Sequence, residues 1–186
     1  MPRPEQQAAP SDADVVRAVL DGRPDMYRHL VERYQDVLYR HAIRMARRPD
    51  DASDLVQRAF VKGFRSLADC RHPEKVGGWL FRITANLCKD YLKNRRRDEV
   101  GLDDAPTLVS ERGDPALELD RSELGADLRR ALDALTGDQR EAFVMKHVED
   151  LSYEEMAERL EVSVPALKMR VHRAREQLRG LLSDYR

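Results

Sequence analysis

The sequence is short of the residues that build disulfide scaffolds, turn-rich folds and membrane spans. Its 186 residues include only nine glycines, nine prolines and two cysteines, Cys70 and Cys88. Two cysteines without zinc-ligand spacing exclude a disulfide or zinc framework. No stretch approaches the roughly 18 consecutive apolar residues of a membrane span, and residues 1–10 lack the apolar core of a signal peptide. We therefore expect a protein of the reducing cytoplasm without direct membrane insertion, with Cys88 in the core and Cys70 exposed in a loop.

Strand signals are missing as well, because alternating Val, Ile or Thr runs bounded by turn residues do not occur. Charged residues make up 36% of the chain, against roughly 25% in typical soluble domains. Apolar residues recur at helical spacing between capping residues. The sequence therefore predicts an all-α fold.

Helix start and stop signals predict four helices in a first domain, residues 11–97. One begins at Ser11 or Asp12 and closes at Gly22, and the next runs from Pro24 to Pro49. A third opens at Asp50 and Asp51 and buries Phe64. After a loop over 69–78, Trp79 starts the fourth.

A second helical domain is expected over residues 117–186. Its capping boxes pair Thr136 with Gln139 and Ser152 with Glu155, and Ser163 caps the last helix. Residues 98–116, rich in Asp, Gly and Pro, are predicted to form a flexible acidic linker between the domains. Residues 1–10 are expected to be disordered.

The net charge of −1 conceals segments of opposite sign. Six Lys or Arg residues accompany a single Asp over 82–97, and five accompany a single Glu over 168–179. Between them, residues 98–127 carry ten acidic residues and two arginines. Separate basic faces can bind a polyanion whatever the total charge, although one such run alone is also typical of a solvated helix face.

Two short helices near the C-terminus have the spacing of a helix-turn-helix: residues 153–160, a three-residue turn, and a second helix from Val164. In this motif the second helix enters the DNA major groove with its N-terminal half. The side chains outside its apolar stripe are Lys168, Met169, Arg170, His172 and Arg173. An arginine there suits bidentate binding of guanine, and Lys168 suits phosphate. The alternative is an ordinary helical hairpin with a basic surface.

The basic helix of the first domain mixes cations with Trp79, Phe81 and Asn86. Aromatic rings stack on unpaired bases and an amide bonds a base edge, so this mixture suits single-stranded or distorted DNA. The alternative is that both rings are core residues. The acids at 50–54 cannot favour DNA, and either complement the helix dipole or form a docking face for a basic protein.

Three motifs, in this order, carry a resemblance to a known family. They are DDASDLVQRAFVKGF (50–64), WLFRITANLCKDYLKNRRR (79–97) and LSYEEMAERLEVSVPALKMRVHRAREQL (151–178). The chain resembles a bacterial RNA polymerase sigma factor of the extracytoplasmic-function (ECF) group. The motifs are similar to the regions that dock on the polymerase clamp, open and read the −10 element, and read the −35 element. The resemblance implies two all-helical domains on a flexible tether.

The resemblance also implies the function. The protein binds core RNA polymerase and directs it to promoter DNA, with no catalysis, metal or cofactor of its own. Polymerase binding is assigned to Asp51, Asp54 and Gln57. Recognition of the −10 element is assigned to His72, Lys75, Trp79, Arg82, Asn86, Lys89 and Lys93. A further implied partner is an anti-sigma factor, often anchored in the membrane.

Three positions depart from the family pattern. Arg58 stands where an acid is common, and it either weakens docking or lies on the far face. Glu161 occupies a turn position that is commonly Gly, where a left-handed backbone costs roughly 1 kcal/mol or more. Met169 replaces a smaller polar residue and is expected to alter the −35 preference. The alternative function is a stand-alone helix-turn-helix regulator, while an enzyme is disfavoured because the sequence has no phosphate-binding glycine loop or metal motif.

Overall fold

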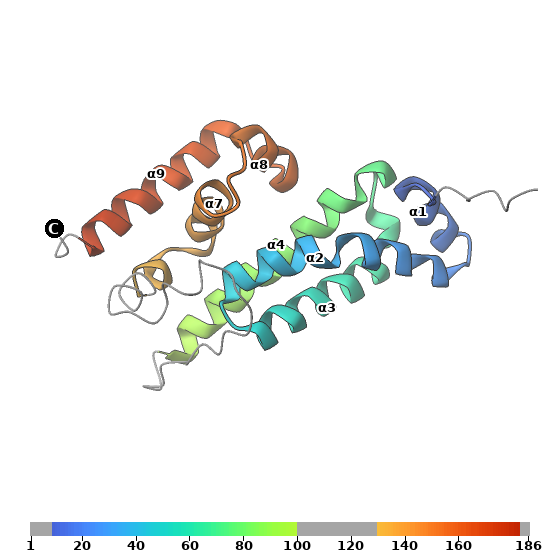
Figure 1. Ribbon diagram of the computed structural model, residues 1–186, viewed down its shortest axis with the longest axis horizontal. Coiled ribbons are helices and arrows are strands. Elements are labelled where there is room, and N and C mark those ends of the chain that lie inside the picture. The colour runs from blue at the N-terminus through green and yellow to red at the C-terminus, as the bar shows by residue number, and fades with distance from the viewer. Residues whose placement is uncertain (1–8, 100–129, 183–186) are drawn as a thin grey trace, which may run out of the picture.

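The described part of the chain is built from helices. The computed structural model describes residues 9–99 and 130–182, except for the side chains of 98 and 99. Its α-helices are α1 (Asp12–Leu20), α2 (Arg28–Ala46), α3 (Pro49–Arg65), α4 (Val76–Glu99), α7 (Gly137–His147), α8 (Tyr153–Leu160) and α9 (Val164–Leu181) (Figure 1). Short 3-10 turns lie at Pro24–Tyr27, Leu67–Asp69 and Pro73–Lys75. No strand occurs within these ranges, so the all-α prediction is confirmed.

Two predicted segments fall largely outside the described residues. These are the disordered start, of which only residues 9 and 10 are described, and the acidic linker. α4 continues to Glu99, two residues into the predicted linker.

Side chains cap three of the helices as the sequence predicts, whereas Ser163 takes the N-cap position of α9 without a side-chain hydrogen bond to it. At the start of α1, Ser11 Oγ accepts a hydrogen bond from Asp14 N at 3.2 Å. Both predicted capping boxes are present, Thr136 with Gln139 at α7 and Ser152 with Glu155 at α8. These bonds satisfy N–H groups that the first turn of a helix leaves without partners, so they fix where α7 and α8 begin.

Helices α2, α3 and α4 pack against one another in the first unit. Three details differ from the predictions. α2 ends at Ala46, and Pro49 opens α3 rather than closing α2. α4 begins at Val76, because a 3-10 turn leads directly into it, so Gly77 and Gly78 are helical. Phe64 is 43% exposed, since it lies at the edge of the core with its ring 5.1 Å from that of Tyr27.

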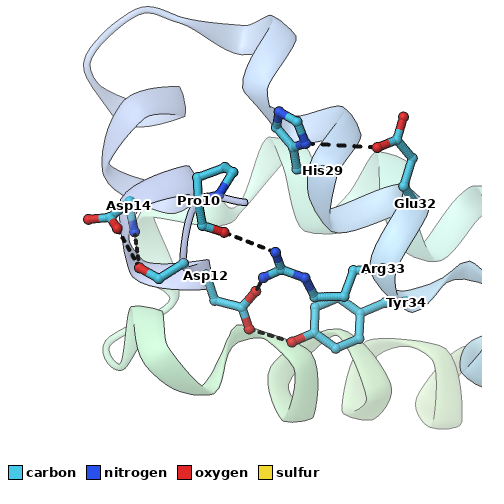
Figure 2. Close-up of polar contacts among 8 residues, drawn as sticks. Pro10, Asp12, Asp14, His29, Glu32, Arg33 and Tyr34 are labelled. Carbon is cyan, nitrogen blue, oxygen red and sulfur yellow. Dashed lines mark hydrogen bonds and ion pairs between the residues drawn. The ribbon is translucent and has the colours of Figure 1, made fainter. Parts of the chain in front are cut away.

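A polar cluster holds α1 against α2 and positions the start of α4. In Figure 2 the Asp12 carboxylate contacts both the Arg33 guanidinium and the Tyr34 hydroxyl. Arg33 also donates to Pro10 O at 2.9 Å. The Tyr34 ring in turn lies over Gly77, where an added Cβ would come within 2.5 Å of a ring carbon. The absence of a side chain at Gly77 therefore lets the start of α4 pack closely on α2.

The second unit contains the predicted helix-turn-helix, formed by α8 and α9 and packed on α7. Met156, Leu167 and Val171 are buried in the main core. Ala174 and Leu178 of α9 form a smaller buried cluster with Ala131 and Leu135. The motif is thus supported on two sides, and the outer face of α9 stays exposed.

The two helical units lie against each other. α4 packs on both α7 and α8, and α2 packs on α7 (Figure 1). One continuous buried cluster runs through this contact and includes Phe81 from the first unit and Met145 and Met156 from the second. The tether expected from the sequence therefore joins units that share an apolar interface.

Candidate nucleic-acid interface

The N-terminal half of α9 presents the predicted DNA-contacting side chains. Lys168, Met169, His172 and Arg173 are exposed. The Arg170 side chain is only 28% exposed, and its Nη2 lies 3.6 Å from Asp138 Oδ2 of α7. This surface is cationic with one exposed thioether, and one of its arginines is engaged by a neighbouring helix.

The turn before α9 contains the predicted strain. Glu161 adopts the left-handed conformation with φ 54°, which favours glycine because a Cβ crowds the adjacent carbonyl. Its carboxylate lies 2.7 Å from the Arg82 guanidinium of α4. The side chain that makes the turn unfavourable therefore also makes a contact that glycine would lack.

The α4 residues assigned to the −10 element lie on one side of the helix. Trp79, Arg82, Asn86, Lys89 and Lys93 are three or four residues apart, which aligns them along one face. Asn86 and Lys93 are exposed, and the other three are partly buried. This face thus combines an aromatic ring, an amide and three cations.

Phe81 lies outside this face. It is 3% exposed, and its ring centroid is 4.5 Å from that of His41. The interpretation of Phe81 as a core residue is therefore correct, whereas Trp79 remains partly exposed.

The loop before α4 borders an open groove of about 1070 Å³ between the two units. His72 and Lys75 line it with side chains that are 73% and 65% exposed. Trp79 and Arg82 line the groove from α4, and residues of α8 line it from the second unit. The groove thus brings together four of the residues assigned to the −10 element.

The two cysteines are both buried. The prediction that Cys70 is exposed was wrong: it lies between two 3-10 turns, is 8% exposed, and its Sγ lies 3.6 Å from His72 O. Cys88 lies in the core as predicted. Burial raises the pKa of both thiols, that of Cys88 to about 12. Neither thiol is therefore readily ionised for redox or metal chemistry.

Acidic residues of the second unit face cations of α4 and of the 3-10 turn before it, a feature that the sequence analysis missed. The Lys75 ammonium lies 3.5 Å from Glu158, and Lys89 Nζ lies 3.3 Å from both Asp138 and Glu141. Together with the Arg82–Glu161 pair, these contacts place a carboxylate beside three of the predicted DNA-binding cations. The sequence did contain a signal for these contacts, because residues 138–161 are rich in Asp and Glu. The sequence analysis considered only the basic residues of the second domain, which lie on α9.

Buried polar groups lie beneath these ion pairs. Glu141 is fully buried, and burial raises the pKa of its carboxyl despite the nearby Lys89 ammonium. His41, 1% exposed, donates from Nδ1 to Glu149 Oε1 at 3.0 Å. Burial opposes ionisation of Glu149, but its bond with His41 and the charge of Arg44 hold its pKa below the usual value. Glu141 Oε1 and His41 Nε2 have no hydrogen-bond partner among the described residues.

The residues assigned to polymerase binding lie along α3. Asp54 and Gln57 are exposed, and Asp54 Oδ2 lies 3.4 Å from Arg58 Nη1. Arg58 therefore lies on the same side of α3 as Asp54, whose charge it partly neutralises. Asp51 is more enclosed, since it accepts a hydrogen bond from Tyr91 at 2.7 Å.

Two exposed apolar side chains extend this face and were not predicted. Val61 is 45% exposed and Phe64 43%, and both follow Gln57 at helical spacing. Val61 also lines a groove of about 600 Å³, together with Asp54, Gln57 and Arg58. The face thus combines carboxylates with accessible apolar area.

Residues 9–99 and 130–182, the part of the chain that the structure describes, contain neither a metal-binding cluster nor a membrane-spanning helix. No group of three or more His, Cys, Asp or Glu residues there is placed to hold a metal ion. None of the helices in that part of the chain is long and apolar enough to cross a membrane.

Known proteins with similar sequences share this arrangement of two units. The family model for sigma-70 region 2 matches residues 30–98, and that for sigma-70 region 4 matches residues 125–178. The ECF RNA polymerase sigma factor SigE of Mycolicibacterium smegmatis is 37% identical over 183 residues. That match covers 95% of this chain and 71% of the relative.

Two solved structures have a similar fold. CnrH, in complex with the cytosolic domain of CnrY, matches with a TM-score of 0.59 and 28% identity, over 95% of this chain and 99% of that one. The sigma factor RpoE from Bartonella quintana, in complex with the anti-sigma factor NepR, matches with a TM-score of 0.56 and 26% identity, over 86% and 98%.

Proposed function

The chain belongs to the family of ECF RNA polymerase sigma factors, and we propose that three of its surfaces divide the steps of transcription initiation. A sigma factor binds core RNA polymerase and directs promoter-specific transcription. The main support for this proposal is that α4 and α9 each have a cationic face. The two helices lie in the units that match sigma-70 regions 2 and 4. A stand-alone helix-turn-helix regulator is not favoured, because it would leave residues 30–98 without a function.

The face of α9 is proposed to read the −35 element in the major groove. Arg173 suits the two acceptors of guanine, and Lys168 suits phosphate. The exposed Met169 suits an apolar contact with a thymine methyl group. Arg170 joins this set once it leaves Asp138.

The face of α4, together with His72 and Lys75, is proposed to bind the melted −10 strand. Trp79 supplies a ring for base stacking, Asn86 supplies an amide for a base edge, and Lys93 supplies charge for the backbone. Unstacking a base costs a few kcal/mol, which contacts in the groove beside Trp79 would offset.

The α3 face is proposed to dock on core polymerase. Its exposed carboxylate and amide, Asp54 and Gln57, suit a basic partner surface. The neighbouring Val61 and Phe64 supply the apolar area that a stable interface needs. Asp51 is proposed to orient this face through Tyr91 as well as to contact polymerase.

Core polymerase is proposed to catalyse RNA synthesis, and this protein is proposed not to be a catalyst. Both solved relatives have a partner in their structures, CnrY for CnrH and the anti-sigma factor NepR for RpoE. We propose that an anti-sigma factor likewise restrains this chain. Work on polymerase and DNA would place it in the cytoplasm, at the nucleoid when active or at a membrane when held by an anchored partner.

Substitution of the docking face tests the proposal. Asp54→Arg reverses an exposed charge and should weaken binding to core polymerase by about tenfold or more. Asp36→Arg on the exposed side of α2 is the matched control and should bind like the wild type. Affinity for core enzyme and run-off transcripts from promoters found by genome-wide mapping are the measurements. Wild-type binding by Asp54→Arg would reject this docking face, and no promoter-dependent transcript with the native chain would reject the assignment of all three surfaces.

A further inference from the structure

We propose that Asp12 and Tyr34 are positioning residues for recognition of the −10 element. Through the Tyr34 hydroxyl they fix the start of α4 and the loop before it, and so set where Trp79 meets a melted base. They act through α4 rather than on the DNA. The inference rests on the −10 role proposed above for Trp79, His72 and Lys75, and it extends that site to the polar cluster that joins α1 to α2.

The Asp12 side chain is turned toward α2. There its carboxylate contacts the Arg33 guanidinium and the Tyr34 hydroxyl (Figure 2). Asp14, in the same first turn of α1, is 58% exposed and accepts a hydrogen bond from the cap residue Ser11, whereas the Asp12 side chain is 16% exposed. A carboxylate that only complemented the helix dipole would not need to be enclosed in this way. The role of Asp12 is therefore its contact with α2.

The Tyr34 hydroxyl donates to this carboxylate and keeps its proton. Burial raises the pKa of Tyr34 to about 12, and the hydrogen bond with Asp12 acts in the same direction. A hydrogen bond to a charged acceptor is roughly twice as strong as one between neutral groups. The bond therefore fixes where the hydroxyl end of the ring lies.

That end of the ring lies against the first turn of α4. A Cβ added to Gly77 would come within 2.6 Å of both Cζ and the hydroxyl oxygen of Tyr34. α1 also packs directly on α4 and on the 3-10 turn Pro73–Lys75, and Val15 and Val76 are fully buried in one cluster. The α1–α2 cluster thus touches both the loop and the start of the helix.

The same turn of α4 carries part of the proposed DNA site. Trp79 follows Gly77 by two positions, and the groove of about 1070 Å³ is lined by Tyr34, Gly77, Trp79, His72 and Lys75. The 3-10 turn that holds Lys75 has no side-chain cap of its own, so its geometry depends on what packs against it. A small displacement of groups that must meet a ligand together can cost far more than the contact that held them. Loss of the Tyr34 hydroxyl should therefore affect base recognition more than folding.

Removal of the hydroxyl and of its acceptor tests the inference. Tyr34→Phe keeps the ring and Asp12→Ala removes the carboxylate. The matched controls are Tyr39→Phe, on α2 but outside the groove lining, and Asp36→Ala, at an exposed position of α2. Each protein is reconstituted with core polymerase on a promoter found by genome-wide mapping, and on the same promoter with single −10 bases replaced. Permanganate reactivity of unpaired thymines measures opening, and the discrimination ratio is opening of the native promoter divided by opening of the substituted one.

We expect Tyr34→Phe and Asp12→Ala each to lower the discrimination ratio by about three- to tenfold. The double variant should lower it no further than one substitution does, because both act through one hydrogen bond. Both controls should keep the wild-type ratio. A loss of folded protein would reduce opening of every promoter by the same factor, so the ratio reports positioning and not stability.

Three results would overturn the inference: a wild-type ratio in Tyr34→Phe, additive effects of Tyr34→Phe and Asp12→Ala, or an equal loss in either control. Trp79→Ala separates the inference from the proposed function. If Trp79→Ala lowers the ratio and Tyr34→Phe does not, the positioning role alone is rejected. If Trp79→Ala leaves the ratio unchanged, the −10 role of the α4 face is rejected, and the positioning role is rejected with it.

Discussion

The exposed side chains of α9 combine two kinds of cation that recognise DNA differently. An arginine can bind the two acceptors of guanine at once, whereas a lysine acts as a point charge on phosphate. Lys168 and Arg173 are both exposed, as the fifth and tenth of the 18 residues of α9. Substitution of Arg173 should therefore change sequence specificity, whereas substitution of Lys168 should change affinity alone.

Arg173→Ala should weaken −35 binding by roughly 1–3 kcal/mol and relax the preference at one base pair. Lys168→Ala should weaken binding to all −35 sequences about equally and reduce the salt dependence. Both are measured by competition of −35 variants for reconstituted holoenzyme. Arg179→Ala, on the exposed C-terminal part of α9, is the control. A base preference unchanged by Arg173→Ala would show that this arginine does not read sequence.

The left-handed backbone at Glu161 gives a second test at a single residue. Glu161→Gly and Glu161→Ala both remove the contact with Arg82, but only glycine adopts φ 54° without a Cβ clash. The glycine variant should therefore be more stable than the alanine variant by about 1 kcal/mol. Urea unfolding measures the difference. If the alanine variant is equally stable, the turn is not strained.

Two neighbouring glycines at the start of α4 differ in how closely α2 packs on them. Gly77 and Gly78 are neighbours in the first turn of α4, and either gains helix propensity as alanine. A Cβ on Gly77 would come within 2.5 Å of the Tyr34 ring, which Asp12 holds in place. A Cβ on Gly78 meets nothing within 4 Å among the described residues.

Gly77→Ala should therefore lower the free energy of unfolding by about 1–3 kcal/mol. Gly78→Ala should raise it by about 0.5–1 kcal/mol. Thermal and urea unfolding of the two variants measure the contrast. The same sign for both would mean that α4 shifts freely on α2.

Local rules predicted most elements because caps and turns depend on residues within about four positions. The two capping boxes and the spacing of the helix-turn-helix follow from such neighbours. The exposure of Phe64 and the burial of Cys70 were not predictable in this way. Each depends on how a helix end or loop lies against the rest of the core, which periodicity does not specify.

At the scale of the whole molecule, the sequence predicted the surfaces but not their contact. The candidate cations on α4 and α9 were identified from charge and spacing alone. Their partners were not, because Lys89 and Glu141, for example, are 52 positions apart. A charged run indicates what a face can bind, and the fold determines whether it is already occupied.

The buried acids make the contact between the units dependent on pH in two separate ranges. Glu141 has a raised pKa in the folded protein, so its proton stabilises the fold as pH falls toward the ordinary glutamate value of 4.5. Glu149 has a lowered pKa, so its contribution is present above 4.5 and is lost as pH falls below that value. Stability should thus pass through a maximum at mildly acidic pH.

Glu141→Gln should remove the dependence of stability on pH that Glu141 causes above pH 4.5, because an amide has no proton to gain. The Glu141 contribution should make the free energy of unfolding of the wild type rise as pH falls from 7 toward 4.5, and the variant should lack this contribution. His147, whose pKa is lowered by burial, acts in the opposite direction in both proteins, so the quantity compared is the difference between their two stability curves. Both proteins should still lose stability below 4.5, where Glu149 becomes protonated in the folded state. Urea titrations from pH 4 to 7.5 measure this, with Glu154→Gln at an exposed position of α8 as the control. A parallel rise in wild type and Glu141→Gln would mean that another group, and not this buried carboxyl, titrates on folding.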